Sequence, residues 1–258
     1  MPKKLLEDKV TIVTGGASGI GRASALLFSK HGAHVIVANR RVEKGKETVS
    51  IIQNNGGSAE FIQTDIANEH HVTSLIDTAM HEHNRIDCAF NCAGYEGMRA
   101  PLIKTDTSHW SEIFDTNTKG TFLLLKHEIP AMAATGGGTI VNMSSISGLI
   151  GRPGRSAYNA SRAAIINLTK TAALESIRSG VRINAVGPGA TRTDIFSHMT
   201  DGLRKEKVEQ YEKLHPIGRI AEPSEIAEAS LWLLSELSSF VVGHTLMVDG
   251  GLSAGVAG

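Results

Sequence analysis

The chain has 258 residues, of which 41% are hydrophobic, 20% charged and 5% aromatic, a composition typical of one globular domain over residues 1–258. Basic and acidic residues each total 26, so the formal net charge is zero and no overall basic field favours nucleic acid or an anionic membrane as a partner. The two cysteines, Cys88 and Cys92, lie in apolar sequence, which excludes a disulfide scaffold and predicts reduced thiols.

The N-terminal segment gives no targeting signal. Its first ten residues include lysines but no apolar run of the ~7–15 residues that a signal peptide needs. No window reaches the ~18 consecutive apolar residues of a membrane-spanning helix. We therefore expect a cytoplasmic protein that does not enter a membrane.

Short β-branched apolar runs alternate along the chain with longer segments of helical spacing, a pattern typical of parallel sheets. The runs predict strands at 10–14, 34–38, 59–64, 86–90, 138–144, 181–186 and 245–248. The spacing predicts helices at 19–31, 42–54, 68–83, about 107–134, 157–179 and 223–236. Because the strands are apolar nearly throughout, we expect helices on both faces. The predicted fold is a single-domain, Rossmann-like, doubly wound α/β fold with seven parallel strands.

Residues 187–217 have no clear periodicity. The segment begins with glycines around a proline and then becomes amphipathic and charged. It follows the carboxyl end of a predicted strand, where ligands bind in open α/β sheets, and long excursions from a compact domain are usually functional or disordered. We predict a mobile flap that borders the substrate.

A glycine-rich turn, TGGASGIG, follows the first predicted strand at 14–21 and leads into a helix. Glycines permit a tight turn and let the backbone approach a pyrophosphate, whose charge then lies at the positive end of the helix. The strict G-x-G-x-x-G string is absent, so a simple packing turn remains the alternative.

The end of the second predicted strand indicates the coenzyme. A carboxylate there would accept hydrogen bonds from the adenosine ribose and repel a 2′-phosphate. This chain has Asn39 followed by Arg40 and Arg41, and guanidinium groups suit a phosphate. The residues favour NADP(H) over NAD(H), unless both arginines merely face solvent.

Tyr158 and Arg162 are four residues apart near the start of a predicted helix and therefore share one face. A cation beside a phenol favours the phenolate, which helps a tyrosine to exchange protons near neutral pH. Ser145, thirteen residues earlier, could hold a substrate carbonyl oxygen. The alternative is an ordinary surface pair of tyrosine and arginine.

Together these features resemble the short-chain dehydrogenase/reductase family, over nearly the whole chain. The matching pieces are TGGASGIG at 14–21, Asp65 and Ile66, NCAG at 91–94, Asn117, SS at 144–145, YNASR at 158–162, PGATRT at 188–193 and VDGG at 248–251.

The resemblance implies a role for most of these residues. It implies that Tyr158 is the general acid or base, that Ser145 orients the carbonyl or hydroxyl group, and that Asn117 holds a water in a proton relay. It implies cofactor contacts in five groups: Gly15, Ser18, Gly19 and Ile20 in the turn; Asn39 and Arg40 at the ribose; Asp65 and Ile66 at the adenine; Asn91, Ala93 and Gly94 beside the cofactor together with Tyr158 and Arg162; and Pro188, Gly189, Thr191 and Thr193 along the nicotinamide. The implied reaction interconverts a ketone and a secondary alcohol by hydride transfer.

Arg162 is a departure from the family pattern, which has Tyr-x-x-x-Lys. Arginine keeps the positive charge but is longer and planar and cannot readily lose its proton. The main alternative is therefore a non-catalytic relative that binds the cofactor. A methyltransferase is a weaker alternative, because Asn39 replaces the acidic residue it would use and the serine, tyrosine and asparagine would have no purpose.

The remaining predictions concern the substrate, metals and assembly. The loop after NCAG and later apolar residues predict a mostly apolar pocket for a ketone or secondary alcohol of moderate size; its candidates are Tyr95, Glu96, Ile146, Leu149, Phe196 and Met199. The histidines at 70–71 and 81–83 match no zinc spacing and are expected to be solvated, so no metal is predicted. The family resemblance implies a homotetramer.

Overall fold

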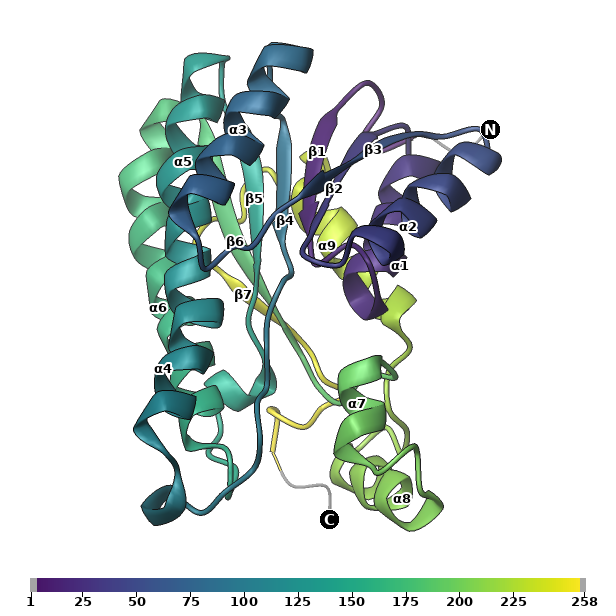
Figure 1. Cartoon of the computed structure of the whole chain (residues 1–258), viewed down its shortest axis with the longest axis vertical. Coiled ribbons are helices and arrows are strands. Elements are labelled where there is room, and N and C mark those ends of the chain that lie inside the picture. The colour runs from purple at the N-terminus through teal and green to yellow at the C-terminus, as the bar shows by residue number, and fades with distance from the viewer. Residues whose placement is uncertain (1–3, 256–258) are drawn as a thin grey trace.

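The structure, a computed structural model, describes residues 4–255 and contains one parallel sheet (Figure 1). The sheet has seven strands in the order β3-β2-β1-β4-β5-β6-β7. The strands are Val10–Thr14 (β1), His34–Asn39 (β2), Ser58–Gln63 (β3), Cys88–Asn91 (β4), Gly138–Met143 (β5), Val181–Pro188 (β6) and Thr245–Val248 (β7). The order reverses direction between β1 and β4, which places a ligand crevice at the carboxyl ends of these strands.

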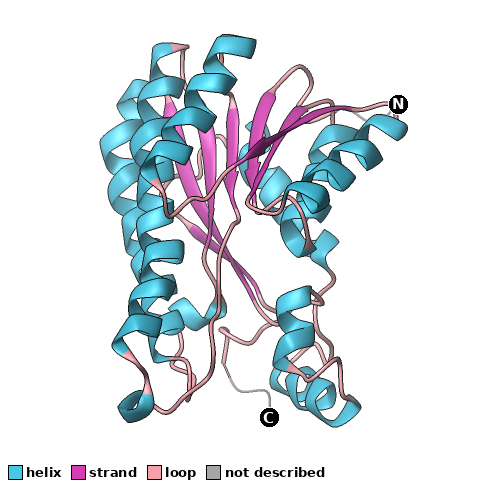
Figure 2. Cartoon of the chain, viewed as in Figure 1, coloured by secondary structure: helices cyan, strands magenta, loops and turns pink. Residues whose placement is uncertain are grey.

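Helices cover both faces of the sheet, as Figure 2 shows. The helices are Gly19–Lys30 (α1), Val42–Asn54 (α2), Glu69–His83 (α3), Thr107–Phe114 (α4), Gly120–Ala134 (α5), Ser156–Ser176 (α6), Asp194–Met199 (α7), Lys205–Leu214 (α8) and Pro223–Leu234 (α9). In Figure 1, α3 to α6 lie on one face and α1, α2 and α9 on the other. The predicted α/β fold, with its parallel seven-stranded sheet, is confirmed.

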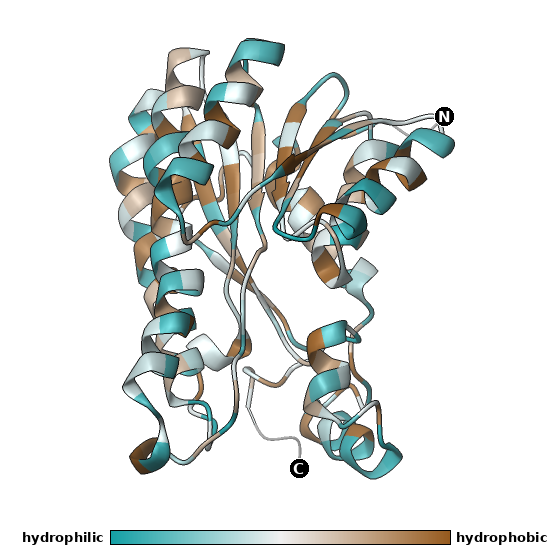
Figure 3. Ribbon diagram, in the orientation of Figure 1, coloured by the Kyte–Doolittle hydropathy of each residue, from teal (hydrophilic) through white to brown (hydrophobic). Residues whose placement is uncertain are grey.

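Two hydrophobic clusters, one on each face, hold these layers together. One contains Ile12, Ile140 and Leu124, and the other contains Val13, Val141 and Phe28, so successive residues of a strand point into opposite clusters. Figure 3 shows the strands mainly brown, the hydrophobic colour, between helices with teal outer turns. The apolar strand sequences are thus explained by burial from both sides.

The predicted helix at 107–134 is not one regular helix. A π-helical turn, Asp115–Lys119, separates α4 from α5. Such a turn holds one residue more than an α-helical turn and is common at functional sites. The turn, DTNTK, is entirely polar and lies between the apolar positions of α4 and α5, but a gap in the apolar pattern does not by itself distinguish a π turn from a continuous helix with a polar stretch.

Residues 187–217 contain two helices, α7 and α8, which the sequence analysis treated as a segment without periodicity. Phe196 of α7 and Tyr211 of α8 pack against Ala190 and Ile220 in a small third cluster. The helices are short, and α8 is largely polar, so their apolar positions form no clear stripe. Among residues 4–255, no helix combines the length and apolar character needed to cross a bilayer.

Candidate active site

A cavity of about 470 Å³ lies at the carboxyl ends of the strands. It brings together most of the residues that the sequence analysis selected from distant parts of the chain. Those that line it are Gly15, Ser18, Gly19, Ile20, Asn39, Arg40, Asp65, Ile66, Ala93, Gly94, Ser145, Ile146, Tyr158, Arg162, Pro188, Gly189, Thr191, Thr193, Phe196 and Met199. The lining excludes Asn91, Asn117, Tyr95, Glu96 and Leu149.

The glycine-rich turn has a shape that only glycine can provide at two positions. Gly15 has φ +70°, and a Cβ there would approach the backbone of Ala93 to 3.0 Å. A Cβ on Gly21 would lie 2.3 Å from the carbonyl oxygen of Gly15. The turn is anchored by a hydrogen bond from Gly15 N–H to the Ala38 carbonyl oxygen at 2.9 Å. The backbone is therefore open toward the cavity and closed to side chains.

The corner at the end of β2 is basic. The Arg41 guanidinium donates to Ser18 Oγ at 2.6 Å, and the Asn39 side chain accepts from Arg41 N–H at 2.7 Å. Arg40 Nη1 lies 3.8 Å from a carboxylate oxygen of Asp65. Both arginines are exposed and line the cavity. The corner can hold an anionic group between the glycine turn and β2.

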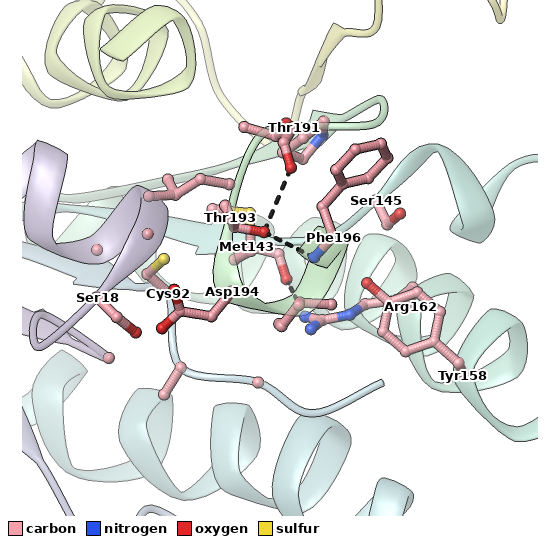
Figure 4. A pocket seen from close by; sticks show the side chains of 18 of the residues that line it. Ser18, Cys92, Met143, Ser145, Tyr158, Arg162, Thr191, Thr193, Asp194 and Phe196 are labelled. Atoms are coloured by element: carbon pink, nitrogen blue, oxygen red, sulfur yellow. Dashed lines mark hydrogen bonds between the residues drawn. The ribbon is translucent and has the colours of Figure 1, made fainter. Parts of the chain in front are cut away.

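Tyr158 and Arg162 lie together at the other side of the cavity (Figure 4). The Arg162 guanidinium carbon is 5.0 Å from the centroid of the Tyr158 ring, a cation–π arrangement. Arg162 is only 3% exposed, and its Nη1 donates to the Met143 carbonyl oxygen at 2.8 Å. Its Nε has no hydrogen-bond partner within residues 4–255.

Gly94 explains how so large a side chain fits beside the cavity. A Cβ on Gly94 would lie 2.2 Å from Arg162 Nη2, so the guanidinium lies directly against the glycine α-carbon. The absence of a side chain at this position makes room for the charge. Arg162 is thus a buried cation facing a tyrosine and a cavity, which matches no ordinary surface pair.

Ser145 follows β5 and is 9% exposed, with its side chain at the cavity. Its Oγ accepts from the backbone N–H of Ser147 at 3.1 Å, which begins a short 3₁₀ turn. Figure 4 places Ser145 on the same side of the cavity as Tyr158 and Arg162. With its acceptor function engaged, the Ser145 hydroxyl can still donate to an oxygen in the cavity.

Asn117 lies in the π-helical turn and is completely buried. Its amide exchanges two 2.8 Å hydrogen bonds with the backbone of Tyr95, and its Nδ2 also donates to Ser161 Oγ at 3.0 Å. A Cβ on Gly94 would lie 3.2 Å from Asn117 Oδ1, so Asn117 is behind the residues that line the cavity. Its side chain therefore positions the loop after β4.

Asn91 is also buried behind the cavity. It donates to Glu128 Oε2 at 2.9 Å and to Asn142 Oδ1 at 3.1 Å, linking β4 to α5 and β5. Burial raises the pKa of Glu128 to about 7, although the hydrogen bond from Asn91 lowers it in part. The structure thus gives Asn91 a direct role in holding the strands together.

The substrate end differs from the predicted apolar pocket. Tyr95, Glu96 and Leu149 do not line the cavity. Glu96 is buried in an ion pair with Arg155, and Leu149 is 53% exposed. The cavity here contains Arg152, Arg155 and Tyr211, which the sequence analysis missed. Three of the predicted substrate residues, Ile146, Phe196 and Met199, line the cavity, but the two arginines of the GRPGR loop also turn inward and add charge that the prediction of a mostly apolar pocket did not include. Their position in the sequence, just before Tyr158, could have indicated that these two arginines lie near the cavity.

The segment 187–217 is attached to the cavity by specific hydrogen bonds. The Thr193 hydroxyl accepts from Phe196 N–H at 3.2 Å and donates to the Thr191 carbonyl oxygen at 3.3 Å, as Figure 4 shows. His215, after α8, accepts from Ala190 N–H through Nε2 at 3.0 Å. These contacts order the wall that runs from Pro188 to α7.

One group of histidines is not simply solvated. His81 is exposed, as predicted, but His83 Nε2 lies 2.6 Å from Glu60 Oε1. His34 Nε2 approaches the same oxygen at 3.3 Å. The correction arises because β2 and β3 bring residues that are far from α3 in sequence against its last turn.

The family model described as enoyl-(acyl carrier protein) reductase matches residues 15–253. With relatives about 40% identical over nearly the full chain, this shows that the chain belongs to the short-chain dehydrogenase/reductase family. It is an oxidoreductase, and the predicted class of alcohol dehydrogenase or reductase acting on CH–OH groups is confirmed.

Two relatives and one solved structure show the extent of the similarity. The A-factor type gamma-butyrolactone 1'-reductase (1S-forming) of Streptomyces virginiae is 40% identical and covers 96% of this chain and 97% of its own. The cis-4-hydroxycyclohexanecarboxylate dehydrogenase of Sinomonas cyclohexanicum is 38% identical with the same coverage. The crystal structure of levodione reductase superposes with a TM-score of 0.94 at 29% identity, over 97% of this chain and 100% of that one.

Proposed function

We propose that this protein interconverts a ketone and a secondary alcohol with NADP(H), and that Tyr158 is the general acid or base. The observation that carries the proposal is the cavity in which Tyr158, Ser145 and the buried Arg162 face the residues of the glycine turn. The reaction needs a proton donor, an oxygen-orienting hydroxyl and a dinucleotide site in one space. These residues offer all three.

The residues fit a dinucleotide. The turn at Gly15 to Gly21 leaves backbone exposed where side chains would collide, and α1 begins directly behind it at Gly19. Thr191 and Thr193, with Ala93 and Gly94, would hold the nicotinamide end. When bound there, the nicotinamide supplies the hydride for reduction or accepts it in oxidation.

Each residue at the reacting end has one task. In reduction, the Tyr158 hydroxyl gives its proton to the carbonyl oxygen, and in oxidation the Tyr158 oxygen takes the proton back. The Arg162 guanidinium lies over the Tyr158 ring and places a positive charge beside the phenol during proton transfer. Ser145 donates a hydrogen bond to the substrate oxygen and fixes its direction. Asn117 holds the loop after β4 against this group.

The coenzyme preference rests on the basic corner. Arg41, held by Ser18, and Arg40 present two guanidinium groups where an adenosine 2′-phosphate would lie. Asn39 carries no charge that would repel it. We therefore propose NADP(H) as the preferred coenzyme, with NAD(H) as the weaker one.

The substrate class follows from the relatives. One is named a cyclopentanol dehydrogenase, from a Comamonas species, at 37% identity, and another is named for a hydroxycyclohexanecarboxylate. We infer a small cyclic ketone or secondary alcohol as the substrate. The wall at 187–217, with Phe196 and Met199, would border it.

The test measures NADPH and NADH oxidation with cyclohexanone and cyclopentanone, in wild type and in Tyr158→Phe. Removal of the Tyr158 hydroxyl should lower kcat by about 10³-fold, because the proton donor is lost. Binding of NADPH, followed by fluorescence, should stay unchanged as the control. Equal rates in wild type and Tyr158→Phe would contradict the proposal.

A non-catalytic cofactor-binding protein is the second candidate, and Arg162 is the observation that favours it. The Nη1 of Arg162 donates to the Met143 carbonyl oxygen, and the planar guanidinium is less able than the compact ammonium of a lysine to lie between the hydroxyls of a cofactor ribose. This candidate expects NADPH binding without turnover in wild type, and turnover that emerges only in Arg162→Lys. Our proposal expects the wild type to be active.

The homotetramer and the cytoplasmic location stay predictions. Large apolar side chains at the surface, among them Phe122 on α5 and Phe240 before β7, are consistent with contacts between copies of the chain. Sedimentation of the purified protein would measure the mass of the assembly. A monomer would contradict the predicted tetramer.

A further inference from the structure

Three arginines converge on one phenol at the substrate end of the cavity. Arg99 and Arg155 donate to the Tyr211 hydroxyl oxygen at 2.7 Å and 2.8 Å. The guanidinium carbon of Arg152 lies 5.1 Å from the centroid of the Tyr211 ring. Arg152, Arg155 and Tyr211 all line the cavity that contains Tyr158.

This cluster has more positive charge than its partners neutralise. Glu96 is the carboxylate that touches it, with Oε1 at 3.1 Å from Arg155 and 3.4 Å from Arg99. Across residues 4–255, Arg152 forms neither an ion pair nor a side-chain hydrogen bond. Burial lowers the pKa of Arg152, and the neighbouring Arg155 lowers it further. A partly buried guanidinium that has an aromatic ring beside it but no anion and no hydrogen-bond acceptor is unfavourable, unless a ligand supplies them.

Tyr211 has an unused donor. Its oxygen accepts from two arginines, whereas its own hydroxyl hydrogen meets no acceptor in the part of the chain that the structure describes. Two guanidinium donors polarise the phenol and strengthen it as a donor. Arg152 and Tyr211 together thus present a cation and a hydroxyl hydrogen to the same space.

Apolar side chains separate this cluster from the glycine turn. Phe196 and Met199 belong to the same lining, and Arg155 Nη2 lies 3.4 Å from the sulfur of Met199. A substrate with its reacting carbon at Tyr158 would therefore place its carbon skeleton along an apolar wall and its far end at Arg152.

We propose that the substrate is anionic, a ketone or secondary alcohol whose carboxylate binds Arg152 and the Tyr211 hydroxyl. This inference rests on the proposed function and adds the charge of the substrate to it. Guanidinium and carboxylate groups match in planar geometry, and such charge-assisted hydrogen bonds are stronger than neutral ones.

The kinetic test compares 4-oxocyclohexanecarboxylate with the neutral 4-methylcyclohexanone, in wild type, Arg152→Gln and Arg178→Gln. Arg178 is exposed beyond the end of α6 and controls for the loss of one positive charge. We expect the ratio of kcat/KM for acid over neutral ketone to fall about 30-fold in Arg152→Gln, mainly through KM. The ratio should stay constant in Arg178→Gln.

A binding test does not depend on turnover. Calorimetry with NADPH present should detect binding of cyclohexanecarboxylate to the wild type. The uncharged carboxamide and cyclohexyl phosphate should both bind more weakly than the carboxylate. Equal binding of acid and carboxamide, or unchanged binding in Arg152→Gln, would overturn the proposal. Tighter binding of the phosphate would replace carboxylate with phosphate as the anion. If only the neutral ketone is reduced, the proposed reaction holds and the proposed anionic substrate is wrong. If neither ketone is reduced, the result contradicts the proposed reaction, and the binding test still decides the charge of the ligand.

A second cluster lies at the opposite edge of the sheet. His34 begins β2, Glu60 lies in β3 and His83 ends α3, and their ligating atoms all lie within 4.8 Å of one another. His83 Nε2 and His34 Nε2 lie 2.6 Å and 3.3 Å from the same oxygen, Glu60 Oε1. His34 Nδ1 lies 2.7 Å from Ser58 Oγ, a contact that leaves Nε2 directed at Glu60.

We infer that His34, Glu60 and His83 form a zinc site. Two imidazoles and one carboxylate are a ligand set that zinc accepts, with water in the fourth position. Ser58 would orient the His34 ring, as groups next to metal ligands commonly do. The metal would connect β2, β3 and α3 far from the cavity, so its role would be structural.

Thermal unfolding of chelator-treated protein tests the zinc site. Zinc at about 100 times its Kd should raise Tm by roughly 5 °C, and calorimetry should give one ion per chain. His83→Asn should abolish both effects, whereas His81→Asn, the exposed neighbour on the same helix, should retain them. Equal loss in the two variants, or no shift in the wild type, would overturn the inference.

Discussion

The two ends of the cavity are built in different ways. The cofactor end is formed mainly by backbone, in a turn where Gly15 and Gly21 leave no space for side chains. The substrate end is formed by long side chains, in which Arg152 and Arg155 of the loop before α6 meet Tyr211 of α8. Backbone geometry fixes the first end rigidly, whereas the second end depends on side chains that a few substitutions can change. The comparison teaches that recognition of the coenzyme and of the substrate can vary independently.

Alanine at two glycines gives the sharpest contrast between the two ends. Gly21→Ala should lower kcat/KM more than 100-fold, because its Cβ would lie 2.3 Å from the Gly15 carbonyl oxygen and the turn must shift. Gly151→Ala, beside Arg152, meets no atom within 4 Å and should leave kcat/KM unchanged. Steady-state kinetics of both variants measure this, and equal effects would contradict the comparison.

Glu128 tests the stability of the region behind the cofactor end. Its pKa is about 7 in the folded protein and near 4.5 when unfolded, so the carboxyl group stays protonated to a higher pH in the folded state. The stability that this protonation contributes is complete below pH 4.5 and is lost as pH rises to 7. Glu128→Gln removes the ionisation and should stabilise the protein by about 2–3 kcal/mol at pH 8.

Urea unfolding at pH 8 and pH 4.5 checks the effect of Glu128→Gln. The difference from wild type should be large at pH 8 and close to zero at pH 4.5. Glu112→Gln, on the exposed side of α4, is the control and should change neither value. A difference that does not depend on pH would mean that Glu128 ionises normally.

The basic corner tests whether the coenzyme is recognised independently of the substrate. Arg41→Gln should raise KM for NADPH about 10-fold and leave KM for NADH unchanged, because the guanidinium would contact only the 2′-phosphate. The ratio of kcat/KM for the acidic ketone over the neutral ketone should not change in Arg41→Gln. The same KM increase for both coenzymes would show that Arg41 only supports the turn through Ser18.

The smallest expected effect is a change in the rate at which the two cysteine thiols are alkylated. Burial raises the pKa of Cys88 to about 11 and that of Cys92 to about 12, so both should react slowly with iodoacetamide at pH 8. Cys92 lines the cofactor end, whereas Cys88 does not. NADPH should therefore slow labelling of Cys92 several-fold without affecting Cys88, and mass spectrometry of labelled peptides measures it.

The cofactor end could be predicted from the sequence because its residues are local. Gly15, Gly19 and Asn39 each follow a strand whose apolar run is easy to recognise, and strand ends of a parallel sheet meet at one edge. The substrate end could not be predicted in the same way. Arg99 and Tyr211 are 112 residues apart, and nothing local indicates that they touch. Their contact depends on how α8 packs, which its polar sequence does not encode.

The site also depended on side-chain direction, which motifs do not state. The motif NCAG led to the prediction that Asn91 contacts the cofactor, but its side chain turns away from the cavity to Glu128. Glu96 was chosen for its position and is instead neutralised by Arg155. In both cases a buried partner from a distant element decided the direction.

The π-helical turn at Asp115–Lys119 has a consequence for how this chain tolerates change in length. A π turn is an α-helix that has taken in one extra residue, so removing one residue there restores a regular helix with α5 in place. A deletion elsewhere in α4 or α5 would instead rotate every later side chain by about 100°. Single-residue deletions should therefore be tolerated by the fold at this turn and at few other helical positions. The same deletion would displace Asn117, so the variant should fold but lose activity.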